Sequence, residues 1–441
     1  MELLGYQCLQ AVLKYMDPNR RRQLVHRIPA LHTAEQVTPL RINNLVFDTN
    51  VTVVNDVSYT ITLFRRYDDP NIPAETIIGF DLDEYGFKTD VSLSPTSTSD
   101  VVLIMDPERI NIQQHLQELQ DAEENLLLTS IAANQHTIAL YQNTIHLYAN
   151  AFPGTYLDQE ITKEALNKIS EAEAEIVKTQ WQLLPYEYRR ANEMPPYTVS
   201  IQLTISSEEE ERVYHMPYTM RVGDAFRKLH GFLFGNHEIQ VNSLNFRTPI
   251  LRWPSSDLKL KLVNQLETFD WEFVNFDSLP KVLSESCFPL NKLVLNCQGP
   301  ERRNARHSAV REAKQLVIYN ANGWDFDYGL LFFVNAFSNL YIHLETEITR
   351  TPNDYLNIVR IWMGHGKEIG AYVSARIKNK DTVVKFFRRL LKRPDVIEET
   401  ERSVKLQMKI GSILDVSCEE MASGAEWLLE MKVVEGNGME F

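Results

Sequence analysis

The chain has 441 residues, of which 44% are hydrophobic and 10% aromatic, and this apolar content excludes a disordered protein. The length exceeds what one hydrophobic core usually supports, so we expect two or three domains. Lys and Arg number 45 against 59 Asp and Glu, and the net charge of −14 opposes non-specific binding to nucleic acid or anionic membrane.

Targeting and cysteine signals indicate an intracellular protein, cytoplasmic or nuclear. Glu2, Lys14 and Asp17 interrupt the N-terminal apolar stretch, so no signal peptide is expected. No window of eighteen apolar residues predicts a membrane helix. The four cysteines have neither disulfide-framework nor metal-ligand spacing, so we expect no metal or cofactor; they are Cys8, Cys287, Cys297 and Cys418.

Residues 1–37 are predicted to form short helices. An apolar stripe follows helical spacing and consists of Leu9, Val12, Leu13 and Met16. Asp17 can cap a second helix, because Pro18 suits the first helical position.

Residues 38–105 are predicted to form a small antiparallel β unit. Apolar residues recur at every second position within 40–47, 51–53 and 57–63, and Asn55-Asp56 is a turn signal between the last two. Further strands are expected through 76–80, 87–93 and 101–105.

Residues 106–195 are predicted to be helical. The helical spacing is interrupted at Pro153-Gly154, and a second stretch runs from Gln159 to about Trp181. Pro185, Pro195 and Pro196 mark a boundary after it. Apolar heptads are not sustained, which favours ordinary helices over a long coiled coil.

Residues 196–441 are predicted to form an α/β domain, which makes the whole chain a mixed α/β protein. Strands are expected at 199–205 and 212–216, an amphipathic helix at 222–234, and strands again at 404–410, 413–418 and 427–434.

A short motif recurs inside this domain. It reads LNKLVL at 290–295, AKQLVI at 313–318 and FSNLYI at 337–342, with looser copies at 244–246 and 260–262. The pattern resembles a leucine-rich repeat, with parallel strands linked by helices at 305–313, 326–334 and after Thr351-Pro352. An ordinary sheet of βαβ units is the alternative. The repeat reading predicts three adjacent, parallel, buried strands that start near Leu293, Leu316 and Leu340.

Motifs that carry chemistry are missing or incomplete. The sequence has no GxSxG, HExxH or GxGxxG. GHGKE at 364–368 lacks the first glycine and the Ser or Thr of a phosphate loop, and DLDEYG at 81–86 places Tyr85 at a calcium-ligand position. Both are predicted to be turns. His343 is predicted to be the outward residue of a strand, and the basic stretches 302–311 and 385–393 to be solvated helix faces. We therefore expect a protein that is not an enzyme.

The first helices resemble an F-box. The resemblance lies in the apolar stripe and in the Met-Asp-Pro corner, and it implies that these residues contact a Skp-type adaptor of a cullin-RING ubiquitin ligase; they are Leu4, Leu9, Val12, Leu13, Met16 and Pro18. Gly5 stands where the F-box pattern has proline, and no tryptophan follows the second helix.

The similarity extends nearly from end to end. Stretches of the whole chain resemble a nematode-expanded family of F-box-like proteins; they are 9–19, 39–43, 197–205, 286–290, 361–370 and 427–434. The resemblance implies an architecture and a class of partner, and it leaves the client protein unknown.

The predicted function is protein binding. The leading hypothesis is a non-enzymatic adaptor, the substrate-recognition subunit of a cullin-RING ubiquitin ligase, which binds a Skp-type adaptor and a protein client. The alternative is an interaction scaffold whose degenerate F-box no longer binds the adaptor. Nucleic-acid binding conflicts with the charge of −14, and a hydrolase with the lack of a nucleophile–base pair.

Overall fold

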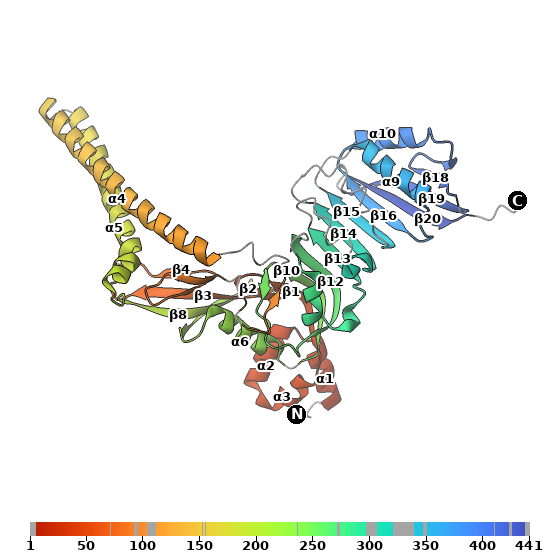
Figure 1. The fold of residues 1–441 in the computed structure, drawn as a ribbon, viewed down its shortest axis with the longest axis horizontal. Coiled ribbons are helices and arrows are strands. Elements are labelled where there is room, and N and C mark those ends of the chain that lie inside the picture. Colours follow the sequence, from red (N-terminus) through yellow and green to blue (C-terminus); the bar gives the residue numbers. More distant parts are fainter. Residues whose placement is uncertain are drawn as a thin grey trace.

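One long, twisted β-sheet organises most of the protein (Figure 1). In the computed structural model the sheet has 16 strands, and helices flank it, so the protein is a mixed α/β protein. The structure describes residues 6–70, 72–91, 95, 97–103, 112–151, 153–154, 156–235, 237–270, 274–296, 307–320, 339–346, 351–409, 411–422 and 426–436.

The centre of the sheet is a run of parallel strands, each paired with the next. In spatial order they are β1 (Leu40–Phe47), β10 (Ile239–Phe246), β12 (Leu260–Asp270), β13 (Lys292–Asn296), β14 (Gln315–Asn320), β15 (Tyr341–Thr346) and β16 (Tyr372–Ile377). The predicted three adjacent parallel strands are confirmed by β13, β14 and β15, and the run continues on both sides of them.

Buried apolar side chains align across this run, because parallel pairing places equivalent residues side by side. We call them the leucine ladder: Leu45, Leu244, Leu266, Leu293, Leu316, Ile342 and Val373. Each is at most 2% exposed, so the ladder forms the middle of one continuous core.

The third strand begins at Tyr341, near Leu340 as predicted, but the third motif copy is aligned two residues later than the motif predicts. Leu316 pairs with Ile342, whereas Leu340 lies before the strand and is 50% exposed. Asn339 takes the place that apolar residues hold in the earlier copies. Its amide nitrogen donates hydrogen bonds to the carbonyls of Val310 (2.9 Å) and Ala313 (2.6 Å), which satisfies the donor side of this buried group.

Antiparallel strands extend the sheet at both ends. On one side β1 is followed by β2 (Val51–Val54), β3 (Val57–Tyr67), β8 (Tyr197–Ser206) and β9 (Glu211–Pro217), with β4 (Glu75–Ile77) beside β3. On the other, β16 is followed by β20 (Trp427–Glu435), β19 (Ser412–Glu420), β18 (Ser403–Gln407) and β17 (Val396–Glu399). Strands from both 38–105 and 196–441 are therefore part of this one sheet.

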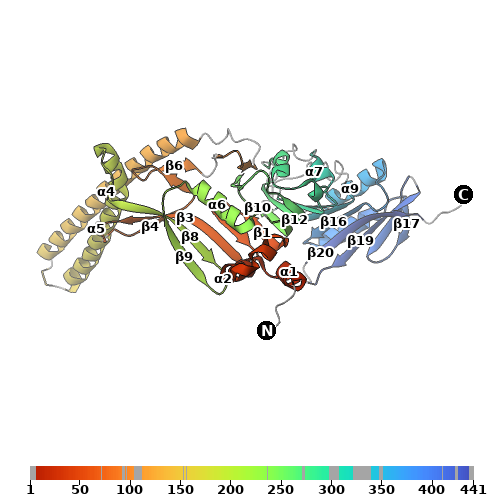
Figure 2. The ribbon, with the colours of Figure 1, turned by 90° about the horizontal axis from the view of Figure 1, so that it is seen from below.

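Helices pack on the apolar face of this sheet (Figures 1 and 2). They are α6 (Val222–Phe234), the short α7 (Ser308–Arg311), α9 (Pro352–His365) and α10 (Lys380–Leu390), with 3-10 turns η3 (Phe276–Lys281) and η4 (Glu285–Cys287). The 222–234 prediction matches α6, and 364–368 lies where α9 ends. Of the helix predicted at 305–313, the described residues 307–313 contain the short α7, and the helix predicted at 326–334 lies outside the described residues.

Two small sheets flank the large one. β5 (Phe80–Leu82) pairs with β6 (Lys88–Val91), and β7 (Val101–Val102) pairs with β11 (Ile250–Leu251). The DLDEYG stretch is the turn of the first, because the Asp83 carboxylate accepts hydrogen bonds from the backbone N–H of Tyr85 and Phe87.

Two long helices, α4 (Ile112–Ala151) and α5 (Tyr156–Ala191), form an antiparallel hairpin that projects from the sheet (Figure 1). At 1.5 Å per residue, α4 is about 60 Å long. The predicted end of the second helical stretch near Trp181 is wrong, because α5 continues through Trp181 and Pro185 to Ala191.

The hairpin is held by sustained heptads, which the sequence prediction missed. Along α5 the residues turned inward recur at alternating spacings of three and four: Thr162, Ala165, Ile169, Ala172, Ile176, Thr179, Leu183 and Tyr186. Those along α4 do the same: Leu127, Ile131, Asn134, Ile138, Tyr141, Ile145 and Tyr148. Alanine, threonine and asparagine fill several of these positions, so a search for large apolar residues cannot detect the repeat.

The N-terminal helices α1 (Tyr6–Tyr15), α2 (Pro18–Arg27), η1 (Pro29–Leu31) and α3 (His32–Gln36) lie beside β1 (Figure 2). Among the described residues, no helix of this protein combines the length and apolar character that crossing a membrane requires.

Candidate protein-binding surfaces

The corner between α1 and α2 fastens the N-terminal helices to the sheet. The Asp17 carboxylate caps α2 by accepting the backbone N–H of Asn19 at 2.9 Å, and it also accepts the side-chain amide of Asn55 at 2.7 Å. The buried Asn19 amide donates to the carbonyl of Val54 at 2.9 Å and accepts the hydroxyl of Tyr59 at 2.7 Å. The Asp-Pro-Asn sequence thus joins α2 to the β2–β3 hairpin.

A buried ion cluster makes a second attachment. Arg21 is 1% exposed and lies 3.2 Å from the Glu35 carboxylate, which also lies 3.0 Å from Nε2 of His237. Arg21 further donates to the carbonyls of Thr38 (2.7 Å) and Pro39 (2.9 Å). Burial opposes the charge of Glu35, but His237 and Arg21 outweigh it, so the pKa of Glu35 is below its ordinary value. The helices are therefore fixed to the sheet.

Part of the predicted adaptor-binding stripe is accessible. Val12 is 47% exposed, and Leu9 and Met16 are half-buried. Beside them is a surface hollow lined by Met16, Asp17, Arg20 and Leu24. A partner helix could contact this apolar strip without any rearrangement of α1 or α2.

The remaining predicted residues are not at the surface or are outside the described chain. Leu13 is 0% exposed, because it faces the interior of the helical unit. Pro18 is also buried, so its role is to begin α2. Leu4 lies outside the described residues. Leu13 and Pro18 are therefore structural members of the motif.

Exposed apolar residues nearby were missed by the sequence prediction. Tyr6 and Tyr15 on α1 are 54% and 75% exposed, and Ile28 and Val37 are 44% and 60% exposed. They lie outside the helically spaced stripe of Leu9, Val12, Leu13 and Met16, so the amphipathic pattern could not identify them. Together with Val12 they make the helical unit rich in exposed apolar side chains.

A second candidate surface is the polar face of the parallel sheet. His343 on β15 points away from the leucine ladder, as predicted for an outward strand residue. Since the Glu345 carboxylate can only accept, Nε2 of His343 donates to it at 2.9 Å, and in the neutral ring Nδ1 then accepts the hydroxyl of Ser374 at 2.7 Å. Arg376 on β16 lies 2.6 Å from Glu345 and 3.6 Å from Glu426.

Aromatic rings border this network. Tyr341 and Tyr372 stack with ring centroids 4.7 Å apart, and the Tyr372 hydroxyl donates to the Glu430 carboxylate. Burial and this carboxylate raise the pKa of Tyr372. Stacked tyrosines with partly exposed charges are typical of recognition surfaces.

The Ser374, His343 and Glu345 contacts have the order that activates a serine in hydrolases. Ser374, however, is 2% exposed in the middle of β16, so a substrate carbonyl has no path to its hydroxyl. The arrangement therefore orders the polar face of the sheet.

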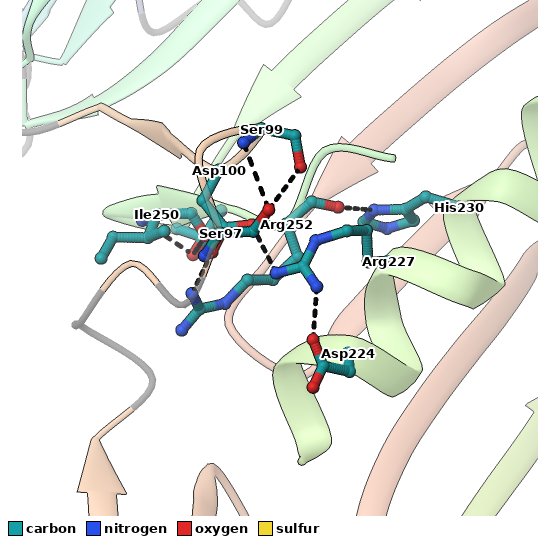
Figure 3. A network of polar contacts seen from close by, with 9 residues as sticks. Ser97, Ser99, Asp100, Asp224, Arg227, His230, Ile250 and Arg252 are labelled. Atoms are coloured by element: carbon teal, nitrogen blue, oxygen red, sulfur yellow. Dashed lines mark hydrogen bonds and ion pairs between the residues drawn. The ribbon is translucent and has the colours of Figure 1, made fainter. Parts of the chain in front are cut away.

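A buried polar network lies beside α6 (Figure 3). The Asp100 carboxylate is fully buried and lies 3.0 Å from Arg227 of α6 and 2.7 Å from Arg252 after β11. Arg227 also pairs with Asp224. The network ties the segment before β7 to α6, and each arginine offsets the buried charge of Asp100.

His230 completes this network in a neutral form. Its Nδ1 donates to the carbonyl of Arg252 at 2.6 Å, so Nε2 accepts the hydroxyl of Thr52 at 2.7 Å. Burial lowers the pKa of His230 to about 4. The imidazole therefore stays uncharged at neutral pH.

Metal-ligand groups and disulfides are not found in the described part of the chain. No group of three or more His, Cys, Asp or Glu residues among the described residues could hold a metal ion. Cys8 is exposed, whereas Cys287 and Cys418 are buried, and all three are free thiols.

Part of the chain matches a known family model. Residues 221–379 match the family model of a domain of unknown function (DUF3557). The matched stretch begins at α6 and ends just after β16, so it contains the ladder strands from β10 onward together with α9. The N-terminal helices, the hairpin and β17–β20 lie outside it. No curated protein matches the chain.

Proposed function

We propose that this protein is a non-enzymatic adaptor in which α1–α3 bind a Skp-type ligase adaptor and the polar face of the sheet binds a protein client. It would then act as the substrate-recognition subunit of a cullin-RING ubiquitin ligase. The observation that carries the proposal is the accessible apolar strip around Val12, held on a helical unit that the sheet fixes in place.

The rigid attachment of α1–α3 to the sheet would hold the two proposed binding surfaces at a fixed distance from each other. Arg21 and Asn19 bind the helices to the sheet through buried contacts, so a ligase core docked on α1 would keep a constant distance from a client on β15 and β16. Such an adaptor contributes effective concentration rather than chemistry.

The test is a charge placed in the strip. Val12→Glu introduces a carboxylate at a half-exposed position, where a docked partner would desolvate it. Central apolar positions of an interface often contribute about 2 kcal/mol or more, so binding of a Skp-type adaptor should fall well over tenfold. The melting temperature should change little, because Val12 is 47% exposed.

A matched control is available one residue away. Ala11 is exposed about 100° around α1 from Val12 and lies off the strip that Val12 forms with Leu9 and Met16, so Ala11→Glu adds the same charge and should leave adaptor binding intact. Equal loss with both variants, or adaptor binding by Val12→Glu at the level of the unmodified protein, would contradict the proposal. The pair Leu13→Ala and Met16→Ala is a poorer test, because removal of the buried Leu13 side chain also destabilises the fold.

The second candidate function is an interaction scaffold whose F-box-like helices bind no ligase adaptor. The observation that favours it is the burial of Leu13 and Pro18, two of the six residues in the resemblance, inside the body of the protein. Pull-down with the unmodified chain discriminates the two, since the scaffold captures clients but no Skp-type adaptor.

A further inference from the structure

The outer side of α4 carries a second heptad stripe, distinct from the one that packs on α5. Leu126, Leu140 and Leu147 are 70%, 56% and 68% exposed and are separated by multiples of seven residues. We call the whole stripe the outer seam; its members alternate at spacings of four and three: Leu126, Ser130, Ala133, Thr137, Leu140, Thr144, Leu147 and Ala151.

The two threonines of the outer seam already form hydrogen bonds within the helix. The Thr137 hydroxyl donates to the carbonyl of Ala133 at 3.0 Å, and the Thr144 hydroxyl donates to that of Leu140 at 2.9 Å. Both threonines can therefore enter a dry contact without losing a hydrogen bond.

The two helices of the hairpin differ in charge. Between Glu124 and Asp158 the sequence contains no Asp, Glu, Lys or Arg. On α5, by contrast, exposed ion pairs such as Lys168–Glu171 and Lys178–Glu175 cover the outer side. A solvated helix face normally carries charges, as α5 does, so the outer side of α4 has the composition of a covered surface.

We propose that the outer seam binds the outer seam of a second copy of this chain, with the two α4 helices antiparallel, so that the protein forms a two-fold symmetric dimer. The proposal does not depend on the adaptor function, because it uses only the hairpin.

The seam is complementary to itself in this orientation. A two-fold axis midway between Thr137 and Leu140 pairs those two residues across the interface. The same axis pairs Ser130 with Leu147, Ala133 with Thr144, and Leu126 with Ala151. Each leucine then faces a small side chain, which is the alternation that close helix packing requires.

Charge and length favour a second copy as the occupant. A chain with a net charge of −14 repels itself, and the uncharged side of α4 is a face that two copies can bring together without opposing like charges. The proposed overlap ends near Leu126, just before the acidic residues Glu118, Asp121, Glu123 and Glu124. Because the sheet lies at the base of the projecting hairpin (Figure 1), antiparallel pairing would also place the two sheets at opposite ends of the paired hairpins.

Sedimentation velocity on the full chain, from about 1 to 100 µM, tests the dimer. The unmodified protein should associate to a dimer, and Leu140→Glu and Leu140→Lys should each raise the dissociation constant at least about tenfold. Because the two copies of residue 140 lie near the axis, an equal mixture of the Glu and Lys variants should dimerise again. Gln142→Glu, exposed on the other side of α4, should dimerise normally.

Cross-linking tests the orientation, in a background of Cys8→Ser and Cys297→Ser. Ser130→Cys and Leu147→Cys should form a disulfide with each other when mixed, and neither should do so efficiently alone. A chain that stays monomeric at the highest concentration overturns the proposal, as does a Leu140→Glu variant that dimerises like the unmodified protein. Cross-linking of each variant with itself, rather than with the other, overturns the antiparallel arrangement.

Discussion

The leucine ladder and the α4–α5 hairpin both contain apolar residues at a regular spacing, but these residues are buried to different depths. Ladder residues are at most 2% exposed, because strands on both sides and helices above enclose each of them. In the hairpin only one neighbouring helix covers each seam, and the inward residues of α4 remain half-buried. The ladder should therefore govern global stability, whereas the hairpin should open locally.

The hairpin joins the body through a small contact at its base. Phe87 of the β5–β6 turn packs with Leu183 and Tyr186 of α5 and with Leu127 and Ile131 of α4. The Tyr186 ring lies 4.8 Å from that of Phe87. So small a cluster couples the two regions weakly, and substitutions in one should spare the other.

The largest effect is expected in the ladder. Leu293→Ala should lower the free energy of unfolding by about 2 to 5 kcal/mol, because it leaves a cavity in the centre of the sheet. Val294→Ala, half-buried on the opposite face of β13, should lower it by about 1 kcal/mol or less. Urea titration followed by tryptophan fluorescence measures both. Equal effects would show that the ladder is not the main core.

Acid should lower the free energy of unfolding through His230. Its folded pKa of about 4 lies below the value near 6.5 expected when unfolded, so only the unfolded chain takes up a proton between these values. The stabilisation that neutral His230 gives the folded protein is fully present above pH 6.5. It declines by up to about 3 kcal/mol as the pH falls toward 4.

Comparison with His230→Gln isolates this contribution. The stability advantage of the unmodified protein over the variant should shrink as urea titrations move from pH 7 to pH 4.5. A difference that is constant with pH would contradict a neutral, buried His230.

The smallest effect is expected in the hairpin. Ala172→Leu overfills the inward seam of α5 and should destabilise the hairpin by about 1 to 3 kcal/mol. Val177→Lys, on the charged outer side, should change stability by about 0.5 kcal/mol or less. Amide hydrogen exchange within residues 112–191 should be faster in Ala172→Leu and unchanged in Val177→Lys. Faster exchange in β13–β16 as well would show that the two regions are coupled more tightly than their contact suggests.

Strand and helix positions with strong local signals could be predicted from sequence. The amphipathic pattern of 222–234 and the alternation of 199–205 match α6 and β8, because local periodicity reflects a buried face directly. The parallel order of β13, β14 and β15 followed from the recurring motif. The register of the third copy did not, since Asn339 became acceptable only through carbonyls supplied by the preceding segment.

The candidate surfaces show the same division. The helical stripe of α1 was visible in the spacing of Leu9, Val12 and Met16, but the burial of Leu13 depends on what packs against it. The polar cluster around His343 and Arg376 draws on strands that are distant in sequence, and no local pattern connects them.

The sequence by itself determined the charge, the apolar periodicity and the uncharged stretch after Glu124, because each depends only on the order of residues. Only the tertiary structure decided that strands before and after the hairpin share one sheet. It also decided that small residues such as Ala165 and Ala172 form a heptad seam. Strand pairing between distant segments and the packing of small side chains both depend on which residue lies opposite in space. A local sequence pattern does not identify that residue.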